Sequence, residues 1–320
     1  MKTLVSSVKY INCSFFFNSV LIVICLLLNL NGFSQDVRIQ QKIYFISDVQ
    51  APLPIEKMVL KAYKNEEARD ILFADILLHH PINLLMLGDL TSRGSVEKAW
   101  RPLDDFMNSL KKIGTKVYAI PGNHEYMSRF SGSTNMFIQR FPKEWLSGYV
   151  VSIDSIAIVM LNSNFKSMAD NELSKQLKWF NSTMISLDSD PAINAIIVCT
   201  HHSPFSNSKI VGSSEPVQKL IIPAFEKSQK SKLFISGHSH NLEYFNFGKH
   251  FLVIGGGGGL TQPLTPRINS KHHDLLDQDL KPLYFYLIIE KDGNKLKLIV
   301  RGFKKDFIFF EYLIGIIPIK

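Results

Sequence analysis

Short apolar segments that end in polar residues constrain the fold of this chain more than any other feature. The clearest is Val117–Ile120, which is followed by Pro-Gly-Asn-His-Glu over residues 121–125. Proline and glycine end strands because they interrupt the hydrogen-bonded ladder. Open α/β sheets place their ligand sites beyond the carboxyl ends of strands. One such motif can arise by chance, so its meaning depends on whether other strands end in the same way.

The first part of the chain alternates apolar segments with segments of helical composition. We predict strands over 42–48, 83–89 and 116–123, and helices over 56–79 and 95–112. Pro102 is expected to break or bend the second helix. Because the strands are apolar throughout, the pattern predicts a parallel sheet that is covered on both faces.

The later part of the chain is richer in β-structure. Hairpins are predicted at Asp154-Ser155, Gly248-Lys249 and Asp292-Gly293-Asn294, and apolar strands over 193–200 and 232–236. Helices are predicted over 170–187 and 214–229. The five-glycine segment 255–259 is interpreted as a flexible turn that opens a long loop through residue 281. The alternative is a glycine segment that brings backbone close to a ligand.

The N-terminus has the features of a secretory signal peptide. Residues 1–34 contain two lysines and no acid, an apolar run from Val20 to Leu30, and small residues at Gly32 and Ser34 before a cut at Gln35. The mature protein is then expected to be secreted or periplasmic, with residues 35–320 as a single domain and no stable membrane span. An uncleaved anchor ranks second because the run is shorter than the ~20 residues of a comfortable span. A lipoprotein through Cys25 ranks third.

Charge and cysteine content narrow the functional classes. Loss of two lysines with residues 1–34 lowers the formal charge from +8 to about +6. This modest excess is compatible with an anionic substrate, and no basic run is dense enough to indicate nucleic-acid binding. Cys199 is then the only cysteine left, so the mature chain has no internal disulfide.

Five apolar strands end in residues that can bind a metal ion. Carboxylate oxygen and imidazole nitrogen suit zinc, manganese and iron, and no cysteine takes part in these endings, which excludes a structural thiolate zinc site. The five endings are Asp48-Val49-Gln50, Gly88-Asp89, Gly122-Asn123-His124-Glu125, His201-His202 and Gly237-His238-Ser239-His240.

In order and spacing, these motifs resemble those of the calcineurin-like metallophosphoesterase superfamily. Within this superfamily, Trp100, Asn162-Ser163-Asn164 and His202-Ser203-Pro204 resemble the motifs of purple-acid-phosphatase-like members. The resemblance implies a four-layer αββα sandwich, with two mixed β-sheets flanked by helices and a metal site at the carboxyl ends of the strands.

The resemblance also implies a role for each site residue. Asp89 is expected to bridge two metal ions. His124 is expected to contact the phosphate or protonate the leaving group, and Glu125 to orient His124. His202 is preferred over His201 as a ligand because it stands two residues before Pro204. The expected ligands are Asp48, Gln50 and His240 for the first metal and Asn123, His202 and His238 for the second, with Asp89 shared.

Two positions depart from the family pattern. Gln50 stands where the family commonly has histidine, and a neutral amide oxygen is a weaker ligand than imidazole. The segment Leu90-Thr91-Ser92 lacks the tyrosine ligand that purple acid phosphatases use there.

The function that follows from the resemblance is metal-dependent hydrolysis of a small-molecule phosphoester. Two divalent or trivalent first-row ions (Fe, Mn or Zn) would activate a water that cleaves a phosphomonoester or phosphodiester. The alternative is a non-catalytic metal- or phosphate-binding protein on a degenerate phosphoesterase scaffold. Gln50, in place of the usual histidine, suggests this alternative. A nuclease is less favoured because no basic, aromatic-studded groove is evident.

Overall fold

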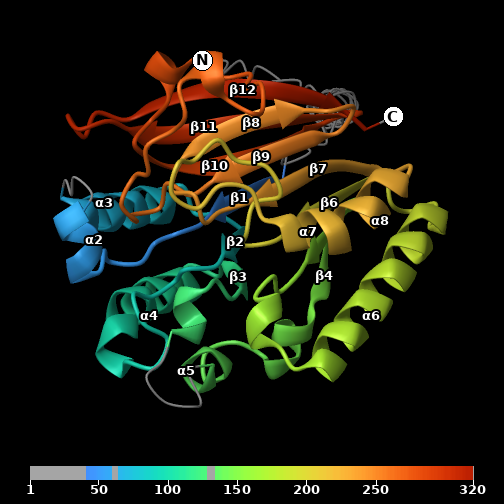
Figure 1. Ribbon diagram of the computed structural model, residues 1–320, viewed down its shortest axis with the longest axis horizontal. Helices are drawn as coiled ribbons and strands as arrows, with labels where there is room; N and C mark the ends of the chain where they lie inside the picture. Colours follow the sequence, from blue (N-terminus) through green and yellow to red (C-terminus); the bar gives the residue numbers. More distant parts are fainter. Residues whose placement is uncertain (1–40, 60–63, 128–133, 320) are drawn as a thin grey trace, which may run out of the picture. The chain divides into compact units, whose positions relative to one another are not determined.

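Two six-stranded β-sheets form the centre of the protein (Figure 1). The structure is a computed structural model that describes residues 41–59, 64–127 and 134–319. The predicted signal peptide over 1–34 lies outside these residues. The first sheet has the order β12-β11-β10-β1-β2-β3. Its strands are β1 (Lys42–Ile46), β2 (Asn83–Leu87), β3 (Lys116–Ile120), β10 (Tyr284–Asp292), β11 (Lys295–Phe303) and β12 (Phe310–Pro318).

The second sheet has the order β4-β5-β6-β7-β9-β8. Both sheets are mixed. In the first sheet β1, β2 and β3 are parallel and the other strands antiparallel, and in the second sheet β5, β6, β7 and β9 are parallel with an antiparallel strand at each edge. The three predicted hairpins are present, and β12 adds a further strand that the sequence patterns did not single out. The strands are β4 (Tyr149–Ile153), β5 (Ile156–Met160), β6 (Ala195–Cys199), β7 (Ser231–Ser236), β8 (Leu242–Asn246) and β9 (His250–Ile254).

Three apolar layers hold the sheets and helices together. The central layer lies between the sheets and includes Phe45, Leu85 and Ile197. An outer layer packs helices α3 (Asn65–Leu78) and α4 (Glu97–Lys112) against the first sheet. Another packs helices α6 (Asp170–Ser189), α7 (Glu215–Leu220) and α8 (Ile222–Lys227) against the second sheet. Strands covered on both faces must be apolar throughout, and β2, β5 and β6 are fully buried. The predicted αββα sandwich is confirmed.

The helices differ from the sequence prediction at their prolines. Pro102 lies inside α4, which nevertheless runs unbroken from residue 97 to 112. The helix predicted over 214–229 is two helices that meet at Ile221. Pro216 lies in the first turn of α7 and Pro223 in the first turn of α8. The N–H groups of a first turn have no partner within the helix, so proline, which lacks an N–H, is tolerated there. In place of the single helix predicted over 56–79, the structure has α2 (Pro54–Val59), which begins two residues earlier, and α3, with residues 60–63 outside the described part.

The topology brings the carboxyl ends of strands from both sheets to one edge. Strands β1, β2 and β3 run parallel to one another in the first sheet, as do β6 and β7 in the second. The sheets are joined there by hydrogen bonds, including one from His201 Nδ1 to the main-chain oxygen of Leu87 at 2.8 Å. Within the described ranges, no helix is both long and apolar enough to cross a membrane.

Candidate metal centre

Four residues of the polar strand endings have an unusual backbone conformation. Asp48, Asp89, His238 and His240 have φ angles of 59°, 52°, 72° and 49°. Residues other than glycine seldom adopt positive φ, because the side chain then crowds its own backbone. Such residues persist only where the surrounding structure holds them, and they gather at functional sites.

Asp48, Asp89 and His240 form the first ligand group. One ligand atom of each residue lies within 4.8 Å of the others, and all three residues are buried. His240 Nε2 is 3.2 Å from Asp48 Oδ1. Two buried carboxylates of the same charge are costly unless a cation lies between them.

Gln50 places its amide beside this first group. When Nε2 donates to the main-chain oxygens of Asp89 and Asp48, at 3.0 and 3.2 Å, Oε1 lies 3.1 Å from His240 Nε2. The opposite orientation would set Oε1 against these two carbonyl oxygens, which cannot donate a hydrogen bond. The amide oxygen therefore faces the interior of the first group, 3.3 Å from Asp89 Oδ2.

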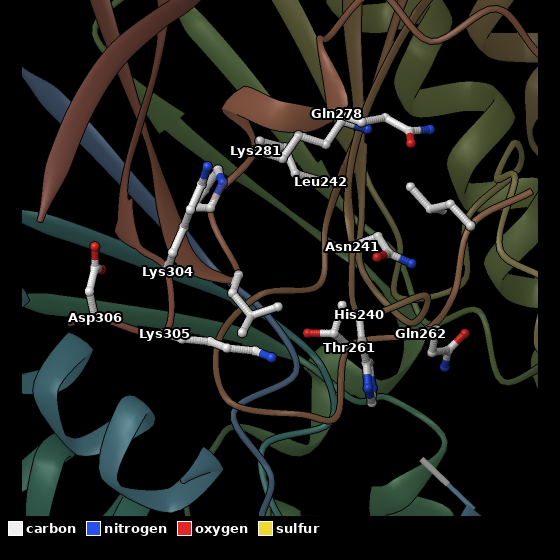
Figure 2. A pocket seen from close by; sticks show the side chains of 13 residues that line it. His240, Asn241, Leu242, Thr261, Gln262, Gln278, Lys281, Lys304, Lys305 and Asp306 are labelled. Carbon is white, nitrogen blue, oxygen red and sulfur yellow. The ribbon is translucent and has the colours of Figure 1, made fainter. Parts of the chain in front are cut away.

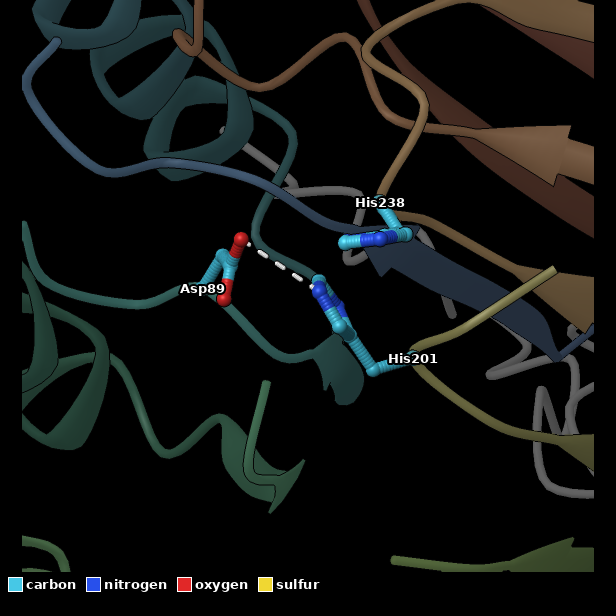
Figure 3. Close-up of side chains that lie close together, drawn as sticks. All are labelled: Asp89, His201 and His238. Carbon is cyan, nitrogen blue, oxygen red and sulfur yellow. Dashed lines mark ion pairs between the residues drawn. The ribbon is translucent and has the colours of Figure 1, made fainter. Parts of the chain in front are cut away.

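Asp89, His201 and His238 form the second ligand group, with ligand atoms within 4.8 Å of one another (Figure 3). His201 Nε2 lies 3.3 Å from Asp89 Oδ2 and 3.1 Å from Asn123 Oδ1. Asp89 belongs to both groups, which is the position that the resemblance implied for a bridging carboxylate.

The structure brings His201, rather than the expected His202, into the second group. The ring of His202 belongs to neither group: its Nδ1 is 2.8 Å from Ser163 Oγ, and its centre is 4.5 Å from that of His238. Successive residues of an extended segment point in opposite directions, so only one of the two histidines can face Asp89. His201 is the second residue after β6, and Asp48, Asp89 and His238 occupy the same place after their own strands. This shared spacing becomes visible once the structure fixes the strand ends.

Main-chain carbonyls fix how the imidazoles are presented. His201 Nδ1 lies 2.8 Å from Leu87 O, His240 Nδ1 2.7 Å from Leu260 O, and His124 Nδ1 2.9 Å from Ser92 O. A carbonyl oxygen only accepts, so Nδ1 carries the proton in each ring. Nε2 is then the atom of each ring that faces the site, as in metal-binding histidines.

His124 lies beside Asp89 but in neither ligand group. Its Nε2 is 3.8 Å from Asp89 Oδ2, and its main-chain N–H donates to Asp89 Oδ1 at 2.9 Å. The carbonyl of Ser92 orients the ring, in place of Glu125, for which the resemblance implied this role.

Glu125 instead fixes the backbone around the ligands. Oε2 accepts hydrogen bonds from the main-chain N–H groups of Asp89 and Gly122, at 2.9 and 2.6 Å. Oε1 accepts from the N–H groups of Leu90 and Thr91, at 2.8 and 3.1 Å. The buried carboxylate thereby joins the loop after β2 to the loop after β3, and its role is to position Asp89 rather than His124.

The buried charges shift one another's pKa values. Burial lowers the pKa of His201, but the Asp89 carboxylate beside it outweighs this effect and raises it to about 9. Burial raises the pKa of Asp89, while His201 and His124 lower it to well below the usual value. Burial and then the Asp89 charge raise the pKa of Glu125 to about 7, although the hydrogen bond from the Gly122 N–H lowers it. Asp89 and His201 thus each favour the charged form of the other.

Glycines let the backbone approach these ligands. A side-chain carbon at Gly122 would lie 2.2 Å from Asp89 Oδ1, and one at Gly259 would lie 2.6 Å from the His240 ring. All five glycines of the 255–259 segment are buried, and the N–H of Gly259 donates to Asp48 O at 2.8 Å. The segment is a packed wall of the site, so its interpretation as a flexible turn was wrong.

A cavity of about 310 Å³ lies over both ligand groups. Its base contains Asp89, Asn123, His124, His238 and His240. Its other walls include the apolar side chains Ile55, Met127, Ile210 and Val211. The site is thus open to a small molecule of which one end is polar and the adjoining part apolar.

The donor set fits two first-row cations. Lone pairs of Gln50 Oε1, Asp89 Oδ2 and His240 Nε2 converge in the first group, and those of Asn123 Oδ1, Asp89 Oδ2 and His201 Nε2 in the second. Acceptors repel at such distances unless a proton or a cation lies among them. Mixed oxygen and nitrogen donors are typical of zinc, manganese and iron sites.

Comparison with known proteins agrees with this geometry. The sequence model of the calcineurin-like phosphoesterase family matches residues 41–242. No curated protein matches the chain.

Several solved structures resemble the fold. A purple acid phosphatase from yellow lupin seeds has a TM-score of 0.62 at 14% identity, with 85% of this chain and 53% of the lupin chain covered. GAP50 of Plasmodium, the anchor in the inner membrane complex, has a TM-score of 0.59 at 14% identity, with 87% of this chain and 89% of the GAP50 chain covered. A dimetal phosphatase from Danio rerio has a TM-score of 0.53 at 15% identity over 86% and 99%. This chain spans about half the length of the lupin enzyme, and identities this low show a shared fold alone.

Proposed function

The chain belongs to the calcineurin-like phosphoesterase family, and we propose that it hydrolyses a small-molecule phosphoester with two metal ions held between its sheets. Family membership makes the chain a metal-dependent phosphoesterase in general terms. The observation that carries the finer proposal is the pair of ligand groups that share Asp89, each with ligand atoms within 4.8 Å of one another.

Each ligand group would hold one ion. Asp48, Gln50 and His240 would bind the first, Asn123, His201 and His238 the second, and Asp89 both. First-row cations bound there supply Lewis acidity toward a phosphoryl oxygen and lower the pKa of a coordinated water.

His124 is suited to handle a proton at the leaving group. Its Nδ1–H is committed to the Ser92 carbonyl, and its Nε2 belongs to the cavity wall beside Asp89. A protonated Nε2 can donate to the departing oxygen of a phosphoester bound in the cavity. The apolar side chains Ile55, Met127 and Ile210 would exclude water from the rest of the substrate.

An activity screen with metal analysis tests the proposal. The purified chain is loaded in turn with iron, manganese and zinc and assayed on aryl phosphates, aryl phosphodiesters and nucleotides from acid to alkaline pH. We expect about two metal ions per chain and turnover of at least one ester class. Absence of turnover across the whole panel would contradict the proposal.

One observation favours a second candidate, a protein that binds metal or phosphate without catalysis. Gln50 gives the first group an amide in place of a more basic imidazole. Fewer than two metal ions per chain, together with tight phosphate binding and no turnover, would support this candidate over the enzyme.

Export from the cytoplasm remains a separate proposal. It depends on residues 1–34 alone, whose sequence predicts cleavage before Gln35. N-terminal sequencing of the protein recovered from the culture medium or periplasm tests it, and an intact Met1 in the purified protein would argue for an uncleaved leader.

A further inference from the structure

A cavity of about 520 Å³ adjoins the second ligand group, and the proposed hydrolysis does not use it. The ligand residues Asn123 and His238 belong to its wall. They also line the 310 Å³ cavity above both groups, as does Val211, so the two spaces meet there. Of the two, only the smaller has His124 among the described residues of its lining. A leaving group that takes a proton from His124 therefore lies in the smaller cavity.

A third cavity, of about 640 Å³, touches the metal centre at His240 alone of the proposed ligands (Figure 2). Figure 2 shows the His240 ring pointing away from Leu242 and Lys281, which also line this space. The imidazole that would bind metal is thus turned from its interior. A group held at the metal centre reaches the 520 Å³ cavity more directly, because two ligand residues form part of that wall.

His202 presents a fixed imidazole to the 520 Å³ cavity, beside the ligand His238. Ser163 Oγ lies 2.8 Å from its Nδ1 and accepts its main-chain N–H at 3.0 Å. Thr200 Oγ1 donates to the His202 carbonyl oxygen at 2.8 Å. Within the described part of the chain, Nε2 has no hydrogen-bond partner. Nε2 is therefore the ring nitrogen that remains for a ligand.

Asn164 adds a hydrogen-bond acceptor to the same wall. This residue is only 6% exposed. Its Nδ2 donates to Pro121 O at 3.1 Å and to Asn162 Oδ1 at 3.0 Å, so both amide hydrogens are used. No described residue donates to its Oδ1. Because polar atoms of buried side chains are normally paired, a group inside the cavity is the natural donor to this oxygen.

The charged residues of this cavity lie at exposed positions and have opposite signs. They are Lys166 and Glu215, and Glu215 is paired with Lys219 outside the lining. The wall next to the ligand residues consists of amide, hydroxyl and imidazole groups. Such a wall suits an uncharged group that can both donate and accept hydrogen bonds.

We propose that the 520 Å³ cavity binds the alcohol that stays on phosphorus when a phosphodiester is cleaved, and that this alcohol carries hydroxyl groups. The inference rests on the proposed hydrolysis and narrows its substrate class to diesters of a hydroxylated alcohol. A hydroxyl group can donate to Asn164 Oδ1, and it matches His202 Nε2 in either tautomer. Both residues act in substrate specificity and take no part in bond cleavage.

The position of His124 explains why a diester fits better than a monoester. Water adds to phosphorus, the bond to the departing oxygen breaks, and that oxygen takes a proton in the smaller cavity. The bond from phosphorus to the second alcohol stays intact, and the product is the monoester of that alcohol. A monoester substrate has no second alcohol, so it would leave the 520 Å³ cavity without an organic group.

Three esters with the same leaving group test the substrate class. They are p-nitrophenyl phosphate, propyl p-nitrophenyl phosphate and dihydroxypropyl p-nitrophenyl phosphate. For the metal-loaded wild type we expect kcat/KM to be about tenfold higher for the dihydroxypropyl than for the propyl diester, because each added hydroxyl gains a hydrogen bond of modest net strength. The monoester should be cleaved more slowly than the dihydroxypropyl diester. A faster monoester, or equal rates for the two diesters, would overturn the inference.

Substitution at His202 assigns the effect to its outer nitrogen. His202→Asn keeps a polar atom near Ser163 but removes Nε2, so the preference for the dihydroxypropyl diester should fall to about threefold, with the propyl diester little changed. His202→Gln extends an amide to the position of Nε2 and should restore most of the preference. Equal losses for both diesters in His202→Asn would contradict the assignment.

His80→Asn is the matched control for this substitution. His80 is exposed and lies between α3 and the amino end of β2, whereas the metal centre lies beyond the carboxyl ends of the strands. The variant should keep the wild-type ratio of the two diesters. A changed ratio in His80→Asn would mean that the assay does not report on the cavity, and the assignment to His202 would fall.

A binding measurement separates this inference from the proposed hydrolysis. Dihydroxybutylphosphonate and butylphosphonate have a P–C bond in place of the retained ester bond, so calorimetry reports their affinity whether or not the chain cleaves esters. A Kd about tenfold tighter for the dihydroxybutyl compound in the wild type, and about threefold in His202→Asn, supports the hydroxyl-binding cavity even if every ester is inert. Equal Kd values in the wild type reject it even if esters are hydrolysed.

Discussion

The two sheets contribute different chemistry to the metal centre. The loops after β1, β2 and β3 of the first sheet supply the carboxylates Asp48, Asp89 and Glu125 and the amides of Gln50 and Asn123. The loops after β6 and β7 of the second sheet supply three imidazoles, those of His201, His238 and His240. Neither sheet has a complete ligand group of its own, because each group in the structure combines Asp89 with an imidazole from the second sheet.

This division shows how the site stabilises its own charges. The first sheet alone would bury carboxylates of like charge close together, and the second would bury histidines with lowered basicity. Packing the sheets together places His201 against Asp89 and His240 against Asp48. Formation of the centre is therefore coupled to packing of the sandwich, and changes on the two sides should have unequal effects.

The largest effect is expected at the one residue shared by both groups. Asp89→Asn removes the only charge common to the two metal positions, so kcat/KM should fall by about 10³-fold or more. Metal content measured by mass spectrometry should fall with it. An unchanged activity would show that the catalytic ions are held elsewhere.

A pH dependence should reveal the contact between the sheets in metal-free protein. The pKa of His201 rises from 6.5 to about 9 on folding, so its protonated form stabilises the fold fully below pH 6.5. This stabilisation is lost as the pH rises through 9, and it amounts to about 3 kcal/mol in the free energy of unfolding. Urea unfolding at pH 7 and pH 9.5 after treatment with a chelator measures it. The loss should be absent in His201→Ala, and an equal loss in that variant would contradict the assignment.

Adjacent histidines on the second sheet allow a matched comparison. His201→Ala removes a ring that faces Asp89 and should lower metal affinity at the second position by about 10²-fold. His202→Ala removes a ring that faces Ser163 and should lower it less than about threefold, because that ring lies outside both groups. Metal titration by calorimetry distinguishes them, and the reverse order would restore His202 as the ligand.

The third carboxylate of the first sheet should matter for stability more than for metal binding. The Glu125 carboxylate accepts hydrogen bonds from main-chain N–H groups through both of its oxygens. Glu125→Gln replaces one oxygen by an NH₂ group, which cannot accept, so the free energy of unfolding should fall by about 2 kcal/mol. Glu144→Gln, at an exposed position, is the control and should change it by less than about 0.5 kcal/mol. Denaturant unfolding of the two variants gives both values.

The smallest expected effect would make the two sheets more alike. Gln50→His adds an imidazole to the first sheet, directed at the first group, and should raise metal affinity there by about tenfold. Gln50→Ala should lower it. If both variants bind metal like the wild type, the Gln50 amide oxygen is not a ligand.

Local sequence patterns predicted much of the fold and most members of the site. Strands such as Asn83–Leu87 are apolar throughout because they are covered on both faces, and this pattern is readable without a structure. The polar residues after β1, β2, β3 and β7 could also be predicted, because a change from apolar to polar residues, often with a glycine, marks the end of a strand.

Details that depend on contacts distant in sequence could not be predicted in this way. One example is the division of the predicted 214–229 helix at Ile221. The two prolines allow a new helix to begin at either of them, and the packing of both helices against the second sheet is a contact between distant parts of the chain. The five-glycine segment has the composition of a flexible turn, yet it is packed against His240 and Asp48. Asp48 is distant from it along the chain, so this contact could not be predicted from local sequence.

The sequence by itself thus determined the ligand types, their order and the strands that present them, because hydrophobic periodicity and strand endings are local properties. Only the tertiary structure decided that His201 faces Asp89 and that Glu125 holds backbone rather than His124. These are questions of side-chain direction between the two sheets, and direction is fixed by packing across residues that are more than thirty positions apart.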